Sequence, residues 1–175
     1  MATDEDLRAA RRLVTQVREI GRDSGREPLR AALRWLTRGR LGRRRGFYAA
    51  PELGTPWQDT PSSERPTWRC RGAYLHGEPV FEVDYRICAD CRLAWVEQPD
   101  TREQYQRLGL ATAGLAQLRA EHPGLSWHTL GGHMFSARPF WNTVGTEVAG
   151  AYRQRALCPH LELRVPAPRH RRGPV

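Results

Sequence analysis

Apolar residues recur every three or four positions from residue 7 to residue 17, which is the spacing of one face of a helix. Thr3, with Asp6 three residues later, has the pattern of an N-terminal helix cap. A second helix is predicted over residues 28–39, where Pro28 suits the first turn. The two helices predict an N-terminal helical hairpin over residues 1–46, packed on a sheet.

Residues 47–67 contain glycine, proline and serine without clear periodicity, so we expect an irregular connection with short structured pieces at Phe47-Tyr48 and Trp57. From Trp68 onward the pattern changes to that of strands. Strands are predicted at residues 68–75, 80–87 and 93–97, with turns between them. They predict an antiparallel meander.

The last third of the chain alternates between helical and strand patterns. A helix is predicted over residues 113–120, and a short strand at 126–130 is closed by Gly131 and Gly132. A short helix is then predicted at 136–144. Residues 152–157 and 161–165 are interpreted as a closing pair of strands. The elements predict an α+β fold in which helices flank a mixed, mainly antiparallel sheet.

The segment between the strand at 93–97 and the next helix has the composition of a phosphate-binding loop. Its residues are Gln106, Arg107, Leu108, Gly109, Leu110, Ala111 and Thr112. A glycine lets the backbone pass close to a ligand, and the first N–H groups of a helix point at an anion. An ordinary strand-to-helix turn is the alternative interpretation of this loop in isolation.

The spacing Gln-x-x-Gly-x-Ala resembles the pyrophosphate loop of the GNAT family of acyl-CoA-dependent N-acyltransferases. In that family the loop helix is followed by a strand that splays from its neighbour, and then by a helix carrying Ala-x-x-Phe-Tyr. Residues 137–141, Ala-Arg-Pro-Phe-Trp, stand in that position. The resemblance implies a GNAT-like core over residues 68–165, followed by a basic flexible tail at 166–175. The family's first strand normally precedes two helices, so here it is expected to be missing.

The resemblance also implies an activity, the direct transfer of an acyl group, in the usual case acetyl, from acyl-CoA to an amine. Backbone N–H groups of residues 107–112 would hold the pyrophosphate. The strand around Trp95, Val96 and Glu97 would pair with the pantetheine amides. The acceptor amine could belong to a small molecule, an aminoacylated RNA or a protein.

Glu97 is the first candidate for the general base, because it ends the strand beside the loop. An exposed strand-end glutamate is the alternative, and Glu82 or Asp84 could line the acceptor side instead. The general acid departs from the family pattern, because Trp141 replaces the usual tyrosine and indole has no proton to give at neutral pH. Tyr152 is the candidate substitute, with His133 and Ser136 as further options, or the thiolate leaves unaided.

The four cysteines suggest a metal site. Cys88 and Cys91 form a Cys-x-x-Cys knuckle between two strands, and Cys158 lies two residues before His160. The sequence is compatible with one structural zinc ion held by these three cysteines and by either Cys70 or His160. Reduced thiols without metal, or a redox pair, are the alternatives.

The net charge of +9 is concentrated at the two ends of the chain. Residues 1–46 carry 13 arginines against six acids, and residues 164–175 add four arginines, whereas the middle is slightly acidic. An alternative function is therefore a non-catalytic binding module whose arginine-rich ends contact nucleic acid or acidic partners. Every basic residue is arginine, which a GC-rich genome explains as well as selection for phosphate contacts does.

The chain contains no apolar run of 18 or more residues, and its first residues are acidic. These features predict neither a membrane span nor a secretory signal. We therefore expect a cytoplasmic location.

Overall fold

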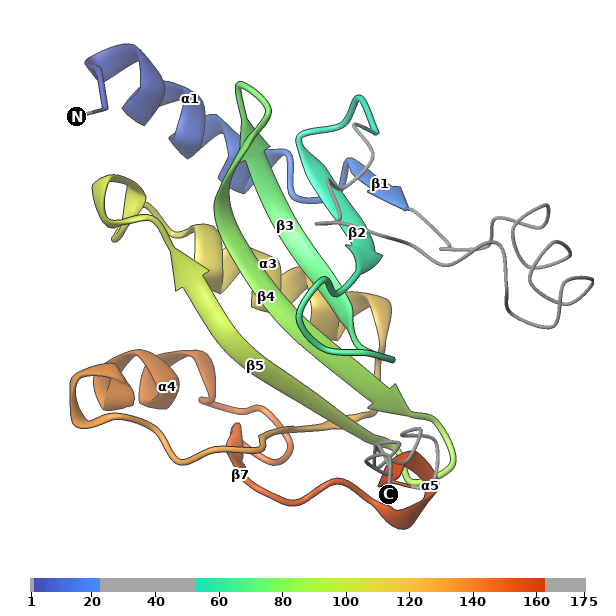
Figure 1. Cartoon of the computed structure of the whole chain (residues 1–175). Coiled ribbons are helices and arrows are strands. Elements are labelled where there is room, and N and C mark those ends of the chain that lie inside the picture. Colours follow the sequence, from blue (N-terminus) through green and yellow to red (C-terminus); the bar gives the residue numbers. More distant parts are fainter. Residues whose placement is uncertain (1, 23–52, 163–175) are drawn as a thin grey trace, which may run out of the picture.

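A seven-stranded mixed sheet forms the centre of the fold, and its strands are ordered as in the chain. Figure 1 shows β1 to β5 side by side. The computed structural model describes residues 2–22 and 53–162. The strands are β1 (Ile20–Arg22), β2 (Trp57–Pro61), β3 (Arg69–Leu75), β4 (Glu78–Cys88), β5 (Leu93–Thr101), β6 (Ser126–Thr129) and β7 (Arg153–Gln154). The α-helices are α1 (Asp4–Thr15), α3 (Leu110–Glu121), α4 (Arg138–Val144) and α5 (Pro159–Glu162), with 3-10 turns η1 (Glu103–Tyr105) and η2 (Phe135–Ala137).

The strand directions divide the sheet into an antiparallel centre and parallel edges. Strands β2 to β5 pair antiparallel, whereas β1 is parallel to β2, β6 to β5, and β7 to β6. This arrangement confirms the α+β class and the predicted meander. It is compatible with a GNAT-like fold.

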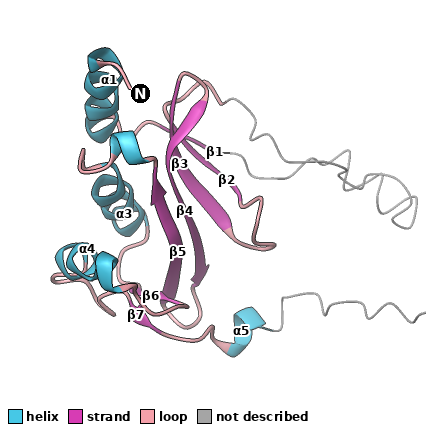
Figure 2. Cartoon of the chain, turned by 60° about the vertical axis from the view of Figure 1, so that its left-hand side comes forward, coloured by secondary structure: helices cyan, strands magenta, loops and turns pink. Residues whose placement is uncertain are grey.

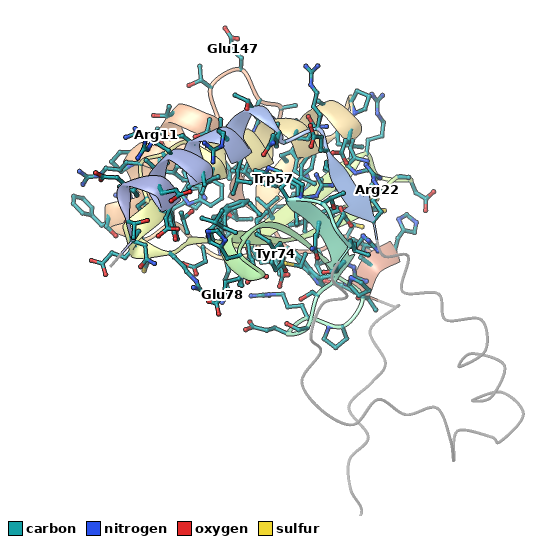
Figure 3. All side chains as sticks on the ribbon, turned by 90° about the horizontal axis from the view of Figure 1, so that it is seen from above. Arg11, Arg22, Trp57, Tyr74, Glu78 and Glu147 are labelled. Atoms are coloured by element: carbon teal, nitrogen blue, oxygen red, sulfur yellow. The ribbon has the colours of Figure 1, made fainter. Side chains whose placement is uncertain are left out.

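Helices α1, α3 and α4 lie on one face of the sheet (Figure 2). The capping box predicted at the start of α1 is present, because Thr3 and Asp6 exchange hydrogen bonds. Trp57 lies inside the molecule, whereas Glu78 and Glu147 point outward (Figure 3). The indole N–H of Trp57 donates to the carbonyl of Leu13 at 2.8 Å, which ties α1 to β2.

A second, smaller core lies on the opposite face. Successive strand residues point to opposite faces of a sheet. Ala94 and Val96 therefore join the main core, while Leu93 and Trp95 join the second one. The other buried members of this second core are Trp68, Cys88, Cys158 and Leu161.

The N-terminal predictions need correction. Strand β1 follows α1 and forms an edge of the sheet, where the sequence predicted no strand; within residues 2–22 no strand precedes α1. Residues 47–67 were predicted to be irregular apart from short pieces; the piece at Trp57 is the start of β2, whose polar residues Gln58 and Asp59 are buried and hide the rest of the strand pattern. The helix predicted at 28–39 and the piece at Phe47-Tyr48 lie outside the described residues.

The predicted closing strands are also wrong in part. Only Arg153–Gln154 of the first one is a strand, and residues 159–162 form the helical turn α5 instead of starting the second one. Pro159 suits the first turn of a helix, and the carbonyl of Cys158 accepts backbone hydrogen bonds from Leu161 and Glu162. Residues 163–165 and the basic tail lie outside the described residues.

Across residues 2–22 and 53–162, no helix is both long enough and apolar enough to cross a lipid bilayer.

Candidate functional site

A cavity of about 760 Å³ opens beside the C-terminal half of β5. Its walls come from four segments: residues 96–101 of β5, residues 105–112 before and at the start of α3, the turn after β6, and residues 136–141 in η2 and α4. Segments far apart in the sequence therefore enclose one space. The predicted phosphate-binding loop and the Ala-x-x-Phe-Trp segment both line it.

The cavity exists because β5 and β6 separate. Residues Leu93 to Trp95 of β5 pair with residues 126–128 of β6, and the two strands do not pair beyond Trp95 and His128. Strand β5 also bulges: Glu97 faces Asp84 and Asp100 faces Glu82, so β5 has one extra residue there. The separation leaves one edge of β5 facing the cavity.

Glu97 lies in the gap between the two strands. Its Oε1 atom accepts hydrogen bonds from the backbone N–H groups of Leu130, at 2.5 Å, and Gly131, at 3.3 Å. Its Oε2 atom is 3.8 Å from a guanidinium nitrogen of Arg65. The carboxylate thus bridges the end of β6 to β5 and also lines the cavity.

The loop before α3 has the backbone shape of an anion site. Gly109 is the N-cap of α3 with a φ of 91°, and Arg107 also has a positive φ, of 62°. No side chain caps this end of α3. The first N–H groups of a helix have no partner within it, so those of residues 110–112 are available to a ligand. A Cβ atom on Gly109 would meet only Val14, at 3.8 Å.

Most of the predicted cofactor-binding residues line the cavity, but two do not. The lining includes Val96, Gln106, Arg107, Gly109, Leu110, Ala111 and Thr112. Leu108 packs instead against the main core. The side chain of Trp95 belongs to the second core, where its indole N–H donates to the carbonyl of Arg155 at 2.9 Å.

Tyr152, the predicted general acid, lies outside the cavity lining. Its side chain is fully buried, and its hydroxyl accepts a hydrogen bond from Arg119. Burial raises the pKa of this phenol, although the guanidinium of Arg119 opposes the shift. The structure therefore places Tyr152 in the core beneath Trp141, at a ring separation of 5.2 Å, rather than beside a ligand.

Tyr105 is a cavity residue that the sequence analysis missed. It belongs to η1, is 7% exposed and lines the cavity directly before Gln106. Its position directly before the predicted loop is the sequence feature that could have identified it.

His133 also lines the cavity. Its ring stacks on that of Trp141, with 4.7 Å between the ring centres, and this pair borders a second cavity of about 500 Å³.

His128 is buried in β6, and burial lowers the pKa of its imidazole. Glu82 and Asp84 share one face of β4, as predicted, and lie outside the cavity lining. The hydroxyl of Tyr74 donates to Glu82 at 3.2 Å, and that of Ser62 donates to Asp84 at 2.9 Å. Burial raises the pKa of both carboxyls.

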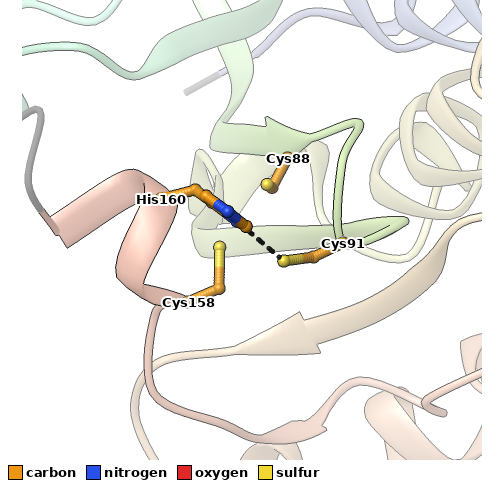
Figure 4. A group of neighbouring side chains, drawn as sticks. All are labelled: Cys88, Cys91, Cys158 and His160. Carbon is orange, nitrogen blue, oxygen red and sulfur yellow. Dashed lines mark hydrogen bonds between the residues drawn. The ribbon is translucent and has the colours of Figure 1, made fainter.

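Three cysteines and a histidine meet at the opposite end of β5 (Figure 4). Cys88 ends β4, Cys91 lies in the turn before β5, and Cys158 and His160 come from the start of α5. One ligand atom from each lies within 4.8 Å of all the others, and Cys91 Sγ is 3.2 Å from His160 Nδ1. This group could hold a metal ion.

Cys70, the alternative fourth ligand, is not part of this cluster. Its thiol lies on β3, 3.9 Å from Glu82 Oε1, and burial beside that carboxylate raises its pKa well above the ordinary range. The structure thus decides between the two predicted ligand sets in favour of His160. The arginine clusters at 38–45 and 169–172 lie outside the described residues.

Searches with this chain match no protein-family model and no curated protein.

Proposed function

We propose that the protein is an acyl-CoA-dependent N-acyltransferase that transfers an acyl group, in the simplest case acetyl, directly to an amine. The observation that carries this proposal is the cavity beside β5. It joins a helix N-terminus suited to a pyrophosphate, a strand edge suited to amide pairing, and a segment rich in apolar residues at 134–141. These three walls suit, in turn, the pyrophosphate, the pantetheine arm and the acyl group of an acyl-CoA.

The binding mode follows from the groups that each wall offers. The N–H groups of residues 110–112 and the guanidinium of Arg107 would hold the pyrophosphate at the start of α3. The edge of β5 from Val96 onward would pair with the pantetheine amides, as an added strand does. The thioester would then lie near the bulge at Gln98.

The reaction requires that the amine nitrogen attack the thioester carbon. A C–N bond forms and the C–S bond breaks, so CoA leaves as a thiolate. The attacking ammonium must first lose a proton to a base, and the thiolate regains one from an acid or from water. Holding both reactants together in one site would supply much of the rate enhancement.

Two carboxylates suit the amine side of this reaction. Glu97 and Asp100 line the cavity on β5, and their negative charge would attract a cationic acceptor. Glu97 is the proposed base, acting on the amine directly or through a water molecule. Tyr105, His133 and Ser136 line the cavity and carry protons, so they are the candidate acids in place of Tyr152.

Calorimetric titration with acetyl-CoA tests the proposal. Gly109→Glu places a carboxylate where the pyrophosphate would lie, so we expect it to weaken binding by at least roughly 100-fold, about 2.7 kcal/mol. Gly54→Glu is the matched control. Gly54 also has a positive φ, of 66°, and open space around it, and it lies outside the cavity lining, so both variants bear similar backbone strain.

The wild-type protein and Gly54→Glu should bind acetyl-CoA equally. No binding by the wild-type protein at high micromolar concentration would sink the proposal, as would equal binding by Gly109→Glu. Release of free CoA thiol with a panel of amines tests turnover. Binding without turnover would favour the non-catalytic binding module instead.

A further inference from the structure

The cluster of Cys88, Cys91, Cys158 and His160 has no part in the proposed transfer reaction. It lies at the start of β5, whereas the cavity lies along the C-terminal half of that strand. Two of its thiols are buried, Cys91 is half-buried, and the imidazole of His160 is exposed. Four groups able to bind one metal ion thus converge from two segments that are about 70 residues apart in the chain.

We propose that these four residues bind one Zn²⁺ ion in a structural site that fastens the C-terminal segment to the β4–β5 turn. Thiolates and imidazole together select zinc over the harder magnesium or calcium ions. Three cysteines and one histidine complete a tetrahedral shell with no open position, which is typical of structural rather than catalytic zinc.

Binding a zinc ion requires only small shifts of the ligand atoms. Tetrahedral zinc with Zn–S near 2.3 Å and Zn–N near 2.0–2.1 Å places neighbouring ligand atoms about 3.5–3.8 Å apart. The ligand atoms of the cluster are within 4.8 Å of one another, and the Cys91–His160 pair, at 3.2 Å, would move apart by a few tenths of an ångström. Rotamer adjustments of about an ångström would close the shell.

A disulfide explains the cluster less well. Three thiols can form at most one disulfide, which leaves one thiol unpaired and gives the imidazole of His160 no role. A zinc ion uses all four groups. The knuckle geometry agrees, because Cys88 and Cys91 flank a two-residue turn and the Arg92 N–H donates to the Ala89 carbonyl at 3.1 Å.

The ion would hold a segment that has little structure of its own. Helix α5 has only four residues, too short to be stable alone. The same segment supplies Leu161 and Cys158 to the second core, and its backbone accepts hydrogen bonds from Trp95 and Arg86, each at 2.9 Å. Zinc would fix this segment over Trp95 and complete the second core.

Metal analysis of the purified full chain tests this inference, independently of acyl-CoA binding. Elemental mass spectrometry should find one zinc per chain. The Cys158→Ser variant should lose the zinc, while Cys70→Ser, the matched control at the cysteine outside the cluster, should keep it. Substoichiometric zinc in the wild-type protein even after incubation with zinc under reducing conditions, or equal zinc in both variants, would overturn the inference.

A cobalt titration covers the case in which Cys158→Ser fails to fold. Co²⁺ in the wild-type site should give thiolate-to-metal charge-transfer bands and the intense visible bands of tetrahedral coordination. His160→Ala changes an exposed side chain, so the chain should still fold while cobalt affinity falls by more than roughly tenfold. His76→Ala is the control for an exposed histidine elsewhere. Weak octahedral bands, or the same affinity in both histidine variants, would count against the site.

Discussion

Asp59 is a buried carboxylate at the centre of a network of hydrogen bonds and ion pairs. Its carboxylate accepts hydrogen bonds from Tyr85, at 2.5 Å, from Arg71, at 2.6 Å, and from Arg69. Arg71 is fully buried and also binds Glu121 of α3, at 2.9 Å. The network therefore links β2, β3, β4 and α3 through one charged group.

Asp59→Asn should destabilise the protein by about 3–5 kcal/mol at neutral pH, because it leaves Arg71 buried with half of its negative partners. Urea unfolding measures the change. Glu147→Gln, at an exposed loop position, is the control and should alter stability by less than about 0.5 kcal/mol. Equal stability of the two variants would contradict this role for Asp59.

The same network predicts a pH dependence. Burial raises the pKa of Asp59, but the Tyr85 hydroxyl and the charges of Arg71 and Arg69 outweigh it, so the folded-state pKa is lowered. A lowered folded pKa stabilises the fold above the unfolded value of about 3.9. That stability is lost as the pH falls from there through the folded pKa. Wild-type stability should therefore fall more steeply below about pH 4 than that of Asp59→Asn.

Glu97 bridges β5 to the end of β6 and is the proposed base, and a conservative substitution separates the two roles. The side-chain amide of the Glu97→Gln variant would keep an oxygen for the N–H groups of Leu130 and Gly131 but could not take a proton. If Glu97 is the base, this variant should lower kcat by about 10²–10⁴-fold with little change in KM for acetyl-CoA. Steady-state kinetics measure this, with Glu82→Gln as the control. An unchanged kcat would leave Glu97 with the bridging role alone.

At the scale of elements, the pattern of apolar residues located most of the fold. Strands β3 to β6 and helix α3 were predicted because each carries a clear period and a turn signal. Only the start of β2, at Trp57, was predicted, because its Asp59 is polar yet buried and is satisfied by partners from β3 and β4. Such long-range compensation leaves no local signal in the sequence.

The candidate site could likewise be predicted only in part. The loop at 106–112 carries its own glycine signal, so its position beside a cavity was expected. The choice between Cys70 and His160 was not predictable, because it depends on how the chain folds back after β7. Tyr152 could not be excluded from sequence either, since its burial beside Arg119 is a tertiary property.

Helix α3 packs closely against the sheet at Gly114, so a larger residue there should change the stability of the fold. A Cβ atom there would lie 2.6 Å from Phe81 and 3.1 Å from Trp57, both buried. Alanine is favoured over glycine in helices by about 1 kcal/mol. We nevertheless expect Gly114→Ala to destabilise by about 1–3 kcal/mol, because the added methyl group would overpack the core.

Chemical denaturation checks the sign of this effect. The exposed Ala116 of the same helix is the comparison site, where Ala116→Gly should cost about 1 kcal/mol through helix propensity alone. A stabilising Gly114→Ala would show that α3 does not pack as closely on β2 and β4 as the structure indicates.

At the scale of the whole molecule, two separate candidate sites lie at the two ends of β5. One end carries the cluster that the proposed zinc would close, and the other carries the cavity between β5 and β6. The main core and the second core lie on opposite faces of the same strands. The zinc would thus stabilise the framework, and the cavity would bind the substrate.

A crystal structure with acetyl-CoA tests the central claim most directly, because it locates every part of the ligand at once. We predict the pyrophosphate at the N–H groups of residues 110–112, the pantetheine arm along the edge of β5 beyond Trp95, and the sulfur near Gln98 and Glu97. Acetyl-CoA bound elsewhere, or a cavity that stays without ligand at saturating acetyl-CoA, would contradict the proposed function.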